Sequence, residues 1–162
     1  MTWAESTARE RLDIMKNAKT VAIVGASDNP ARASCFVSTY LMSSSHFKLY
    51  FVNPRLETLL GQPVYKSLAD IPEHIDIVDV FRKPADCMGI LEEAIAIKAS
   101  TLWLQLGITV PEVAEAGEKA GISVVMNRCL KIEHARFHGG LHLAGFNTGV
   151  ISSQRNAKKG EN

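Results

Sequence analysis

An apolar run, Thr20–Val24, passes directly into the small residues Gly25–Ser27 and then into a polar turn. A short run of this kind is typical of a strand covered on both faces, as in a parallel α/β sheet. Small residues let backbone N–H groups come close to an anion, and a helix that begins near residues 31–34 would direct its positive end to the same place. The sequence therefore predicts a phosphate-binding loop after its first strand.

The same turn has a second interpretation, in which it only connects a strand to a helix. Many tight strand-to-helix turns contain glycine and bind no ligand. The third glycine of the dinucleotide-binding fingerprint is also missing, because Pro30 and Ala31 stand where the later glycines would be sought. The loop is a variant of the fingerprint, and both interpretations stay open on these residues alone.

Length and composition limit the class of protein. A chain of 162 residues suits one domain with a substantial core, which we expect over residues 1–150, followed by a polar tail over 151–162. A net charge of +1 argues against a nucleic-acid binder that relies on bulk charge. No apolar run approaches the roughly 20 residues that a membrane span needs, and residues 1–17 lack the apolar centre of a signal peptide.

The cysteines indicate a compartment. Cys35, Cys87 and Cys129 are scattered along the chain without a Cys-x-x-Cys pair. An odd number of cysteines without framework spacing is typical of proteins in a reducing environment. We therefore expect the protein to be cytoplasmic.

Four further apolar runs alternate with helical patterns and predict the fold class. The predicted strands are residues 20–24, 48–52, 75–81, 100–106 and 122–126, and the stretch 57–72 is predicted to be a loop. Strands separated by helices imply right-handed crossovers and a doubly wound α/β sheet. We expect five mainly parallel strands in the order 3-2-1-4-5, with helices on both faces.

Ligands in such sheets bind beyond the carboxyl ends of the strands. The polar and cationic residues concentrate at these ends, in the segments 25–30, 53–55, 81–83, 105–108 and 127–129. Asn53, followed by Arg55, stands where folds that bind NAD usually carry an acid. A neutral residue with a nearby cation suits an extra phosphate on the adenosine ribose, which admits NADP and coenzyme A (CoA). In the other interpretation, Arg55 only lies on a solvated loop.

Six blocks of residues together resemble a known family. They are 21–27 (VAIVGAS), 51–54 (FVNP), 62–68 (QPVYKSL), 78–82 (VDVFR), 103–108 (WLQLGI) and 125–134 (VMNRCLKIEH). They resemble the stand-alone CoA-binding protein family, which is itself similar to the nucleotide-binding domain of the succinyl-CoA synthetase α subunit. The resemblance covers about residues 18–138 and implies a Rossmann-like domain that holds coenzyme A along its strand ends.

The resemblance also implies roles for individual residues. The pyrophosphate would lie at Gly25–Ser27 and the following helix start, with Arg32 as a further phosphate-binding cation. Residues 53–55 would contact the adenosine and its 3′-phosphate, and 81–83 would flank the adenine or pyrophosphate. Residues 105–108 and 127–128 would line the pantetheine path. The predicted cofactor-binding residues are Gly25, Ala26, Ser27, Pro30, Arg32, Ser34, Asn53, Pro54, Arg55, Phe81, Arg82, Lys83, Gln105, Gly107, Ile108, Asn127 and Arg128.

We predict no catalytic residue and no metal site. In the synthetase, the phosphohistidine lies in a further domain, and we expect none in this chain. Ser27 lacks the Gly-x-Ser-x-Gly surroundings of a nucleophile, and Cys129 is expected to pack in the core. Cys35 falls in the first turn of the helix after the loop, where a mixed disulfide with the thiol of CoA is a separate hypothesis. His134, His138 and His142 are spaced four apart, but two glycines interrupt any helix that would align them.

The sequence thus predicts a protein that binds CoA or an acyl-CoA and does not catalyse a reaction by itself. One alternative is an NADP-dependent oxidoreductase or NADP-binding protein, although no Tyr-x-x-x-Lys pair is evident on a helix. A second alternative is a regulatory subunit that senses acyl-CoA and docks on a protein partner. We expect no binding to nucleic acid or to a membrane.

Overall fold

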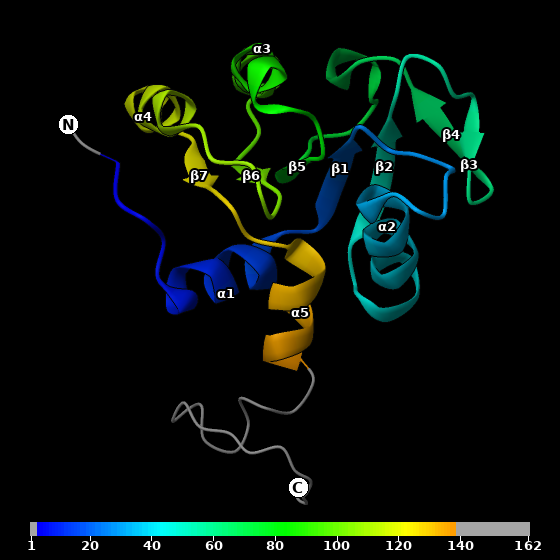
Figure 1. Cartoon of the computed structure of the whole chain (residues 1–162), viewed down its shortest axis with the longest axis horizontal. Helices are drawn as coiled ribbons and strands as arrows, with labels where there is room; N and C mark the ends of the chain where they lie inside the picture. Colours follow the sequence, from blue (N-terminus) through cyan, green and yellow to red (C-terminus); the bar gives the residue numbers. More distant parts are fainter. Residues whose placement is uncertain (1–2, 139–162) are drawn as a thin grey trace, which may run out of the picture. The chain divides into compact units, whose positions relative to one another are not determined.

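One sheet organises the chain, which this computed structural model describes over residues 3–138 (Figure 1). Its strands are β1 (Thr20–Val24), β2 (Lys48–Val52), β3 (Thr58–Leu59), β4 (Gln62–Tyr65), β5 (Ile77–Val80), β6 (Thr101–Leu104) and β7 (Ser123–Val125). They lie in the order β3-β4-β2-β1-β5-β6-β7. Every neighbouring pair is parallel except β3 with β4. The predicted α/β class and the mainly parallel sheet are confirmed.

The prediction of five strands in the order 3-2-1-4-5 is wrong. The segment that was predicted to be a loop contains β3 and β4, and β4 pairs with β2 at its outer edge. β4 therefore lies next to β2, in the place predicted for the third strand. The segment predicted as the third strand is β5, and it lies on the other side of β1. β4 was missed because it is four residues long, is at most half-buried and contains Pro63, which weakens the sequence signal of a strand.

Helices cover both faces of the sheet, as predicted. Those of the first unit, Met1–Leu130, are α1 (Ala8–Asn17), α2 (Ala33–Ser44), α3 (Cys87–Ala96) and α4 (Pro111–Ala120), with 3-10 turns η1 (Leu68–Asp70) and η2 (Pro84–Asp86). A further helix, α5 (Leu130–His138), begins where this unit ends. In Figure 1, α3 and α4 lie on one side of the sheet, and α1 and α2 lie on the other. The carboxyl ends of the central strands are left open between these layers.

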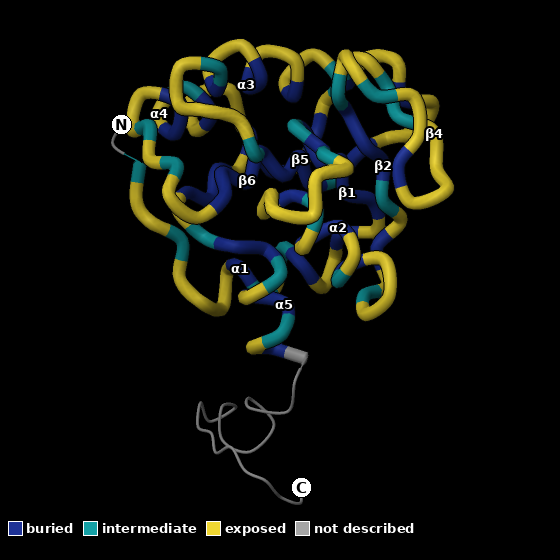
Figure 2. The backbone as a smooth tube through the Cα atoms, turned by 45° about the vertical axis from the view of Figure 1, so that its right-hand side comes forward, coloured by how far each residue is buried: buried dark blue, intermediate teal, exposed yellow. Residues whose placement is uncertain are grey.

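The alternation of side chains along the strands divides the core into two layers. On the face toward α3 and α4, strand residues such as Val78 and Leu102 pack in one cluster with Leu91 and Val113. On the other face, Asp79 is paired in register with the neighbouring Ile23 and Trp103, and all three are fully buried. Figure 2 shows the buried central strands surrounded by exposed connecting segments.

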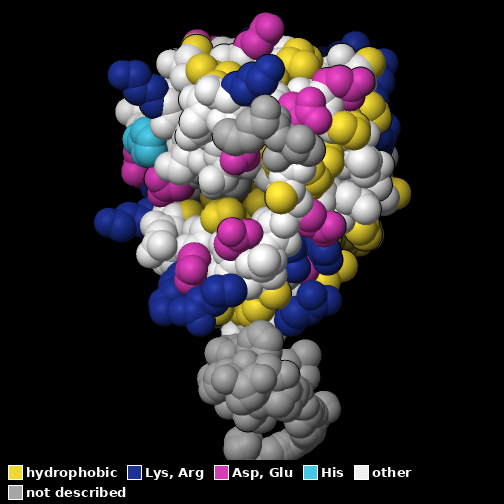
Figure 3. Space-filling model, turned by 90° about the vertical axis from the view of Figure 1, so that its left-hand side faces the viewer, with side chains coloured by type: hydrophobic (Ala, Val, Ile, Leu, Met, Phe, Trp, Pro, Cys, Tyr) yellow, Lys and Arg dark blue, Asp and Glu magenta, His cyan; other side chains and the backbone are white. Residues whose placement is uncertain are grey.

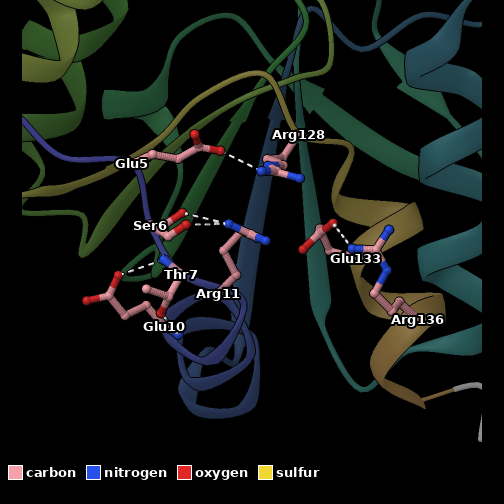
Figure 4. A network of polar contacts seen from close by, with 8 residues as sticks. All are labelled: Glu5, Ser6, Thr7, Glu10, Arg11, Arg128, Glu133 and Arg136. Carbon is pink, nitrogen blue, oxygen red and sulfur yellow. Dashed lines mark hydrogen bonds and ion pairs between the residues drawn. The ribbon is translucent and has the colours of Figure 1, made fainter. Parts of the chain in front are cut away.

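The amino-terminal segment is fastened to the edge of the sheet. The Trp3 indole Nε1 donates to the carbonyl oxygen of Val124 on β7, at 3.1 Å. α1 begins with a capping box, in which the Thr7 side chain accepts from the Glu10 N–H and the Glu10 carboxylate accepts from the Thr7 N–H (Figure 4). This box fixes the start of α1 at Ala8.

The chain divides into two units, Met1–Leu130 and Lys131–Asn162, and every element of the sheet lies in the first. In the second unit, the described residues continue α5, where Glu133 and Arg136 form an ion pair at 3.4 Å (Figure 4). The predicted domain limit at residue 150, the tail 151–162 and His142 lie outside the described residues. Within the described chain, no helix has the length and apolar character needed to cross a lipid bilayer.

Candidate functional site

A pocket of about 680 Å³ opens at the carboxyl ends of β1, β2, β5 and β6. This is the end of the sheet at which the sequence predicted a ligand. Its lining residues are Gly25, Ala26, Ser27, Asn29, Arg32, Ala33, Ser34, Asn53, Phe81, Arg82, Lys83, Asp86, Gln105, Leu106 and Ile108. The parallel topology thus brings together residues that are as much as 83 positions apart in the chain, from Gly25 to Ile108.

Most of the predicted site residues meet in this pocket, and some do not. Those outside its lining are Pro30, Pro54, Arg55, Gly107, Asn127 and Arg128. Four lining residues were not predicted, namely Asn29, Ala33, Leu106 and Asp86. Asn29 and Leu106 lie within the predicted segments 25–30 and 105–108, and Ala33 lies between the predicted residues Arg32 and Ser34. Asp86 stands four residues after Arg82, a spacing at which an acid and a cation on one helix can pair, and this spacing could have identified it.

Glycine is required at position 25 for two reasons. Its φ of +90° is rarely adopted by residues with a side chain. A Cβ at this position would also lie 3.0 Å from the carbonyl oxygen of Phe81 and 3.0 Å from Cδ of Arg82. Gly25 therefore allows the loop after β1 to lie directly against the end of β5, with the Arg82 side chain across it.

The first N–H groups of the loop are not free for an anion, as the sequence had suggested they would be. The N–H groups of Gly25 and Ala26 both donate to the carbonyl oxygen of Val52, at 3.1 and 3.3 Å, and so are occupied within the protein. The Ser27 hydroxyl accepts from the Asn29 N–H at 3.0 Å. The small residues thus clear space, and the open amino end of α2 faces that space through Ala33 and Ser34. A helix start of this kind favours negative charge.

Three cations and one acid give the pocket a positive balance. Arg32, Arg82 and Lys83 line it, and Asp86 is the acidic residue in the lining. The Arg82 guanidinium lies 3.0 Å from Asp86 Oδ2, but that oxygen makes no aligned hydrogen bond among the described residues, so the contact is an ion pair only. Within the described chain, Arg32 and Lys83 have no ion-pair partner. These two side chains are available to an anionic ligand.

Gln105 places an unused acceptor in the wall of the pocket. This residue follows β6 and is only 5% exposed. Its side-chain oxygen Oε1 is buried and has no hydrogen-bond partner among the described residues. Buried polar atoms in proteins are nearly always hydrogen-bonded, so this oxygen is an exception next to the pocket.

Two asparagines brace the loops around the pocket. The Asn53 side chain donates to the Ala26 carbonyl oxygen and accepts from the Arg55 N–H, both at 2.7 Å. Asn127, with a φ of +59°, accepts from the Gly107 N–H at 2.7 Å. Asn53 therefore fixes the loop after β1, and Asn127 fixes the loop after β6 from outside the pocket.

Arg128 is engaged away from the pocket. Its guanidinium contacts the carboxylate of Glu5 in the amino-terminal segment (Figure 4). The hydrogen bond from Arg128, together with its charge, holds the pKa of Glu5 below its ordinary value. The structure thus pairs Arg128 with an acid of the chain itself.

The remaining candidates of the sequence lie outside the pocket. Cys35 is half-buried and does not line the pocket, and Cys129 is buried. Among the described residues, no three His, Cys, Asp or Glu side chains are grouped to hold a metal ion.

The fold and the pocket together define a Rossmann-like nucleotide-binding type of domain. The sequence profile described as the CoA-binding domain matches residues 19–135, and the chain belongs to this family. An uncharacterized protein of Bacillus subtilis, YneT, is 35% identical over 123 residues, which are 76% of this chain and 90% of YneT. A hypothetical protein from Pyrococcus horikoshii has a solved structure with 36% identity and a TM-score of 0.76, covering 81% of this chain and 92% of that one.

The family also connects the chain to larger enzymes. The α subunit of the ADP-forming acetate–CoA ligase II of Pyrococcus furiosus is 35% identical over 66 residues, which are 41% of this chain and 14% of that subunit. The predicted resemblance to a synthetase-type CoA-binding domain is therefore confirmed. The NADP-dependent alternative is not favoured by these relatives.

Proposed function

We propose that the pocket binds coenzyme A, with the pyrophosphate at the amino end of α2. The observation that carries this proposal is the positive balance of the pocket, in which Arg32 and Lys83 have no acidic partner within the described chain. Membership of the CoA-binding domain family and similarity to part of an acetate–CoA ligase support coenzyme A as the source of the phosphates. Arginine suits such a role because its planar fork can meet phosphate oxygens with two hydrogen bonds.

The two arms of the ligand would extend to opposite sides of the anion site. The adenosine would lie toward the end of β2, where Asn53 lines the pocket and Arg55 follows on an exposed turn. The 3′-phosphate would reach Arg55, outside the pocket lining. The pantetheine arm would extend toward the end of β6, past Gln105, Leu106 and Ile108.

We further propose a binding protein without catalysis, acting in the cytoplasm as one domain over residues 1–150 with a tail over 151–162. The described pocket lining contains no His or Cys, and its acid, Asp86, is paired with Arg82. An acid–base pair for chemistry is therefore not evident in this part of the chain.

On the face drawn in Figure 3, basic and acidic side chains both occur, which agrees with a protein of net charge +1 that does not bind nucleic acid. In the second alternative, the protein would also dock on a partner protein and act as a regulatory subunit that senses acyl-CoA.

Calorimetric titration with CoA, dephospho-CoA, NADP and NAD tests the proposal. We expect CoA to bind most tightly, dephospho-CoA less tightly, and Arg55→Ala to remove the difference between these two ligands. Arg32→Ala and Lys83→Ala should each weaken CoA binding by about tenfold to a hundredfold, because each removes a charge-assisted contact.

Arg9→Ala is the matched control, since Arg9 is an exposed arginine on α1 that pairs with Asp13 at 3.4 Å. The Arg9→Ala variant should bind CoA with the same affinity as the unaltered protein. Tighter binding of NADP than of CoA, or the same loss in Arg9→Ala as in Arg32→Ala, would contradict the proposal.

A further inference from the structure

The amino ends of two helices reach the pocket, and the residues before them carry opposite charges. α2 and α3 lie on opposite faces of the sheet (Figure 1), and Arg32 directly precedes α2, whereas Asp86 directly precedes α3. Both residues line the pocket. The first turn of α2 contains no acid. Because a helix start favours negative charge, the start of α2 is left to a ligand, whereas the start of α3 already has a carboxylate of the chain itself.

Asp86 does not act as an ordinary helix cap. An acid at this position commonly accepts a hydrogen bond from a backbone N–H of the first turn. The Asp86 side chain makes no such bond to α3. Its Oδ2 atom is buried instead and lies 3.0 Å from Nη2 of Arg82. The carboxylate is therefore directed toward a cation of the pocket and away from the helix that it precedes.

Arg82 is the cation that the carboxylate and a ligand can both reach. A Cβ at Gly25 would lie 3.0 Å from Cδ of Arg82, so the arginine side chain passes directly over the loop after β1. This side chain is 42% exposed and lines the pocket, which makes it accessible to a bound anion. A phosphate beside the loop and the Asp86 carboxylate would therefore compete for the same guanidinium.

We infer that Asp86 is a specificity-determining residue, which competes with the ligand for Arg82 and so limits the number of phosphate groups that the pocket accepts. This inference rests on the proposed binding of CoA, and it adds a limit on the charge of the ligand. Arg32 and Lys83 remain for one diphosphate, because neither has an ion-pair partner within the described chain. A further phosphate near Arg82 would meet the Asp86 carboxylate, and like charges at close range repel each other.

Calorimetric titrations of ADP and ATP, which differ by one phosphate, test this limit. They use the full chain, the variant Asp86→Asn, which keeps the size of the side chain and removes its charge, and the control Asp13→Asn. Asp13 also pairs with an arginine four positions away, Arg9, at 3.4 Å, but it lies outside the pocket lining. We expect Asp86→Asn to tighten ATP binding about tenfold and ADP binding about threefold or less. Asp13→Asn should change neither affinity.

Two further measurements separate charge from shape. The Debye length falls from about 30 Å at 0.01 M ionic strength to about 3 Å at 1 M. The gain in ATP affinity should therefore shrink as the salt concentration rises. It should also vanish when Asp86→Asn is combined with Arg82→Met, because the guanidinium that the substitution releases is then absent.

The other outcomes contradict the inference in distinct ways. Weaker binding of both nucleotides to Asp86→Asn would show that the carboxylate only positions Arg82. Unchanged affinities, or no binding of ATP to Asp86→Asn, would show that the pocket is not limited by this charge. A gain that persists without Arg82 would refute the competition for its guanidinium. Failure of the unaltered protein to bind CoA would overturn the proposed function, and it is distinguishable because the comparison of ADP with ATP does not require CoA to bind.

Discussion

At the amino ends of β1 and β5, polar groups of neighbouring residues satisfy one another, whereas some of those at the carboxyl ends have no partner among the described residues. Asp76 Oδ2 accepts from the N–H groups of Lys19 and Thr20, at 2.7 and 3.2 Å. The Thr20 hydroxyl donates to the His74 carbonyl oxygen at 2.8 Å and accepts from the Asp76 N–H at 2.9 Å. His74 Nδ1 lies 3.3 Å from the other Asp76 oxygen.

The carboxyl ends of the same strands present the opposite condition. Within the described chain, Arg32 and Lys83 lack acidic partners and Gln105 Oε1 lacks a donor. The two cations are exposed to solvent and need no partner for stability, whereas the buried Gln105 oxygen is an exception among buried polar atoms. Under the proposed function, one end of the sheet serves the fold and the other end serves binding, and substitutions at the two ends should separate these effects.

The largest expected effect comes from Gly25→Ala at the binding end. The new Cβ would lie 3.0 Å from the Phe81 carbonyl oxygen and would require alanine to keep a φ of +90°. We expect a loss of roughly 2–3 kcal/mol in the free energy of unfolding, measured by urea denaturation, and a loss of CoA binding. The Arg82 side chain would also have to leave its place across the loop.

Gly61→Ala is the matched control for backbone strain. Gly61 also has a positive φ, of +76°, but no atom lies within 4 Å of an added Cβ. We expect a cost of about 1 kcal/mol from the conformation alone and no effect on CoA affinity. Equal effects of the two substitutions would refute the importance of the close approach between the loop and β5.

The second effect is expected at the amino ends, from Asp76→Ala. This change removes the acceptor of two backbone N–H groups and should lower the free energy of unfolding by about 2 kcal/mol. Asp76→Asn retains one oxygen and should lose less. Both variants should bind CoA with unchanged affinity at temperatures where they are folded. A weaker affinity in either variant would mean that the two ends of the sheet are coupled.

The sequence predicted the fold class and the strand ends at which the pocket lies, because both depend on patterns that are local. Apolar runs such as 20–24 and 48–52 mark buried strands, and parallel topology then places all their carboxyl ends together. β4 escaped prediction because its burial depends on pairing with β2, and its four residues carry no continuous apolar run.

The roles of individual site residues were less predictable. Asn53 and Asn127 act through hydrogen bonds to residues 27 and 20 positions away, Ala26 and Gly107, and nothing in the local sequence records those contacts. Arg128 looked like a ligand contact from its place after a strand, but Glu5, 123 positions away, pairs with it. Such pairings require the tertiary fold, so the sequence identified the segments of the site better than the function of each side chain.

The smallest effect is expected between the two ends, at Asp79 in the middle of β5. Burial raises the pKa of this carboxyl well above its ordinary value of 3.8, and neither oxygen has a partner among the described residues. Between the ordinary and the raised pKa, the folded protein holds a proton that the unfolded chain releases. The free energy of unfolding therefore falls as pH rises through this window.

Asp79→Asn keeps the shape of the side chain without the titration. We expect it to raise the free energy of unfolding at pH 7 by about 1 kcal/mol, since the neutral amide needs no proton to be buried. Urea denaturation between pH 4 and pH 7 should show a flatter pH dependence than in the unaltered protein. CoA affinity should stay the same, because Asp79 does not line the pocket. A lower CoA affinity in Asp79→Asn would show that the carboxyl group of Asp79 contributes to the binding site.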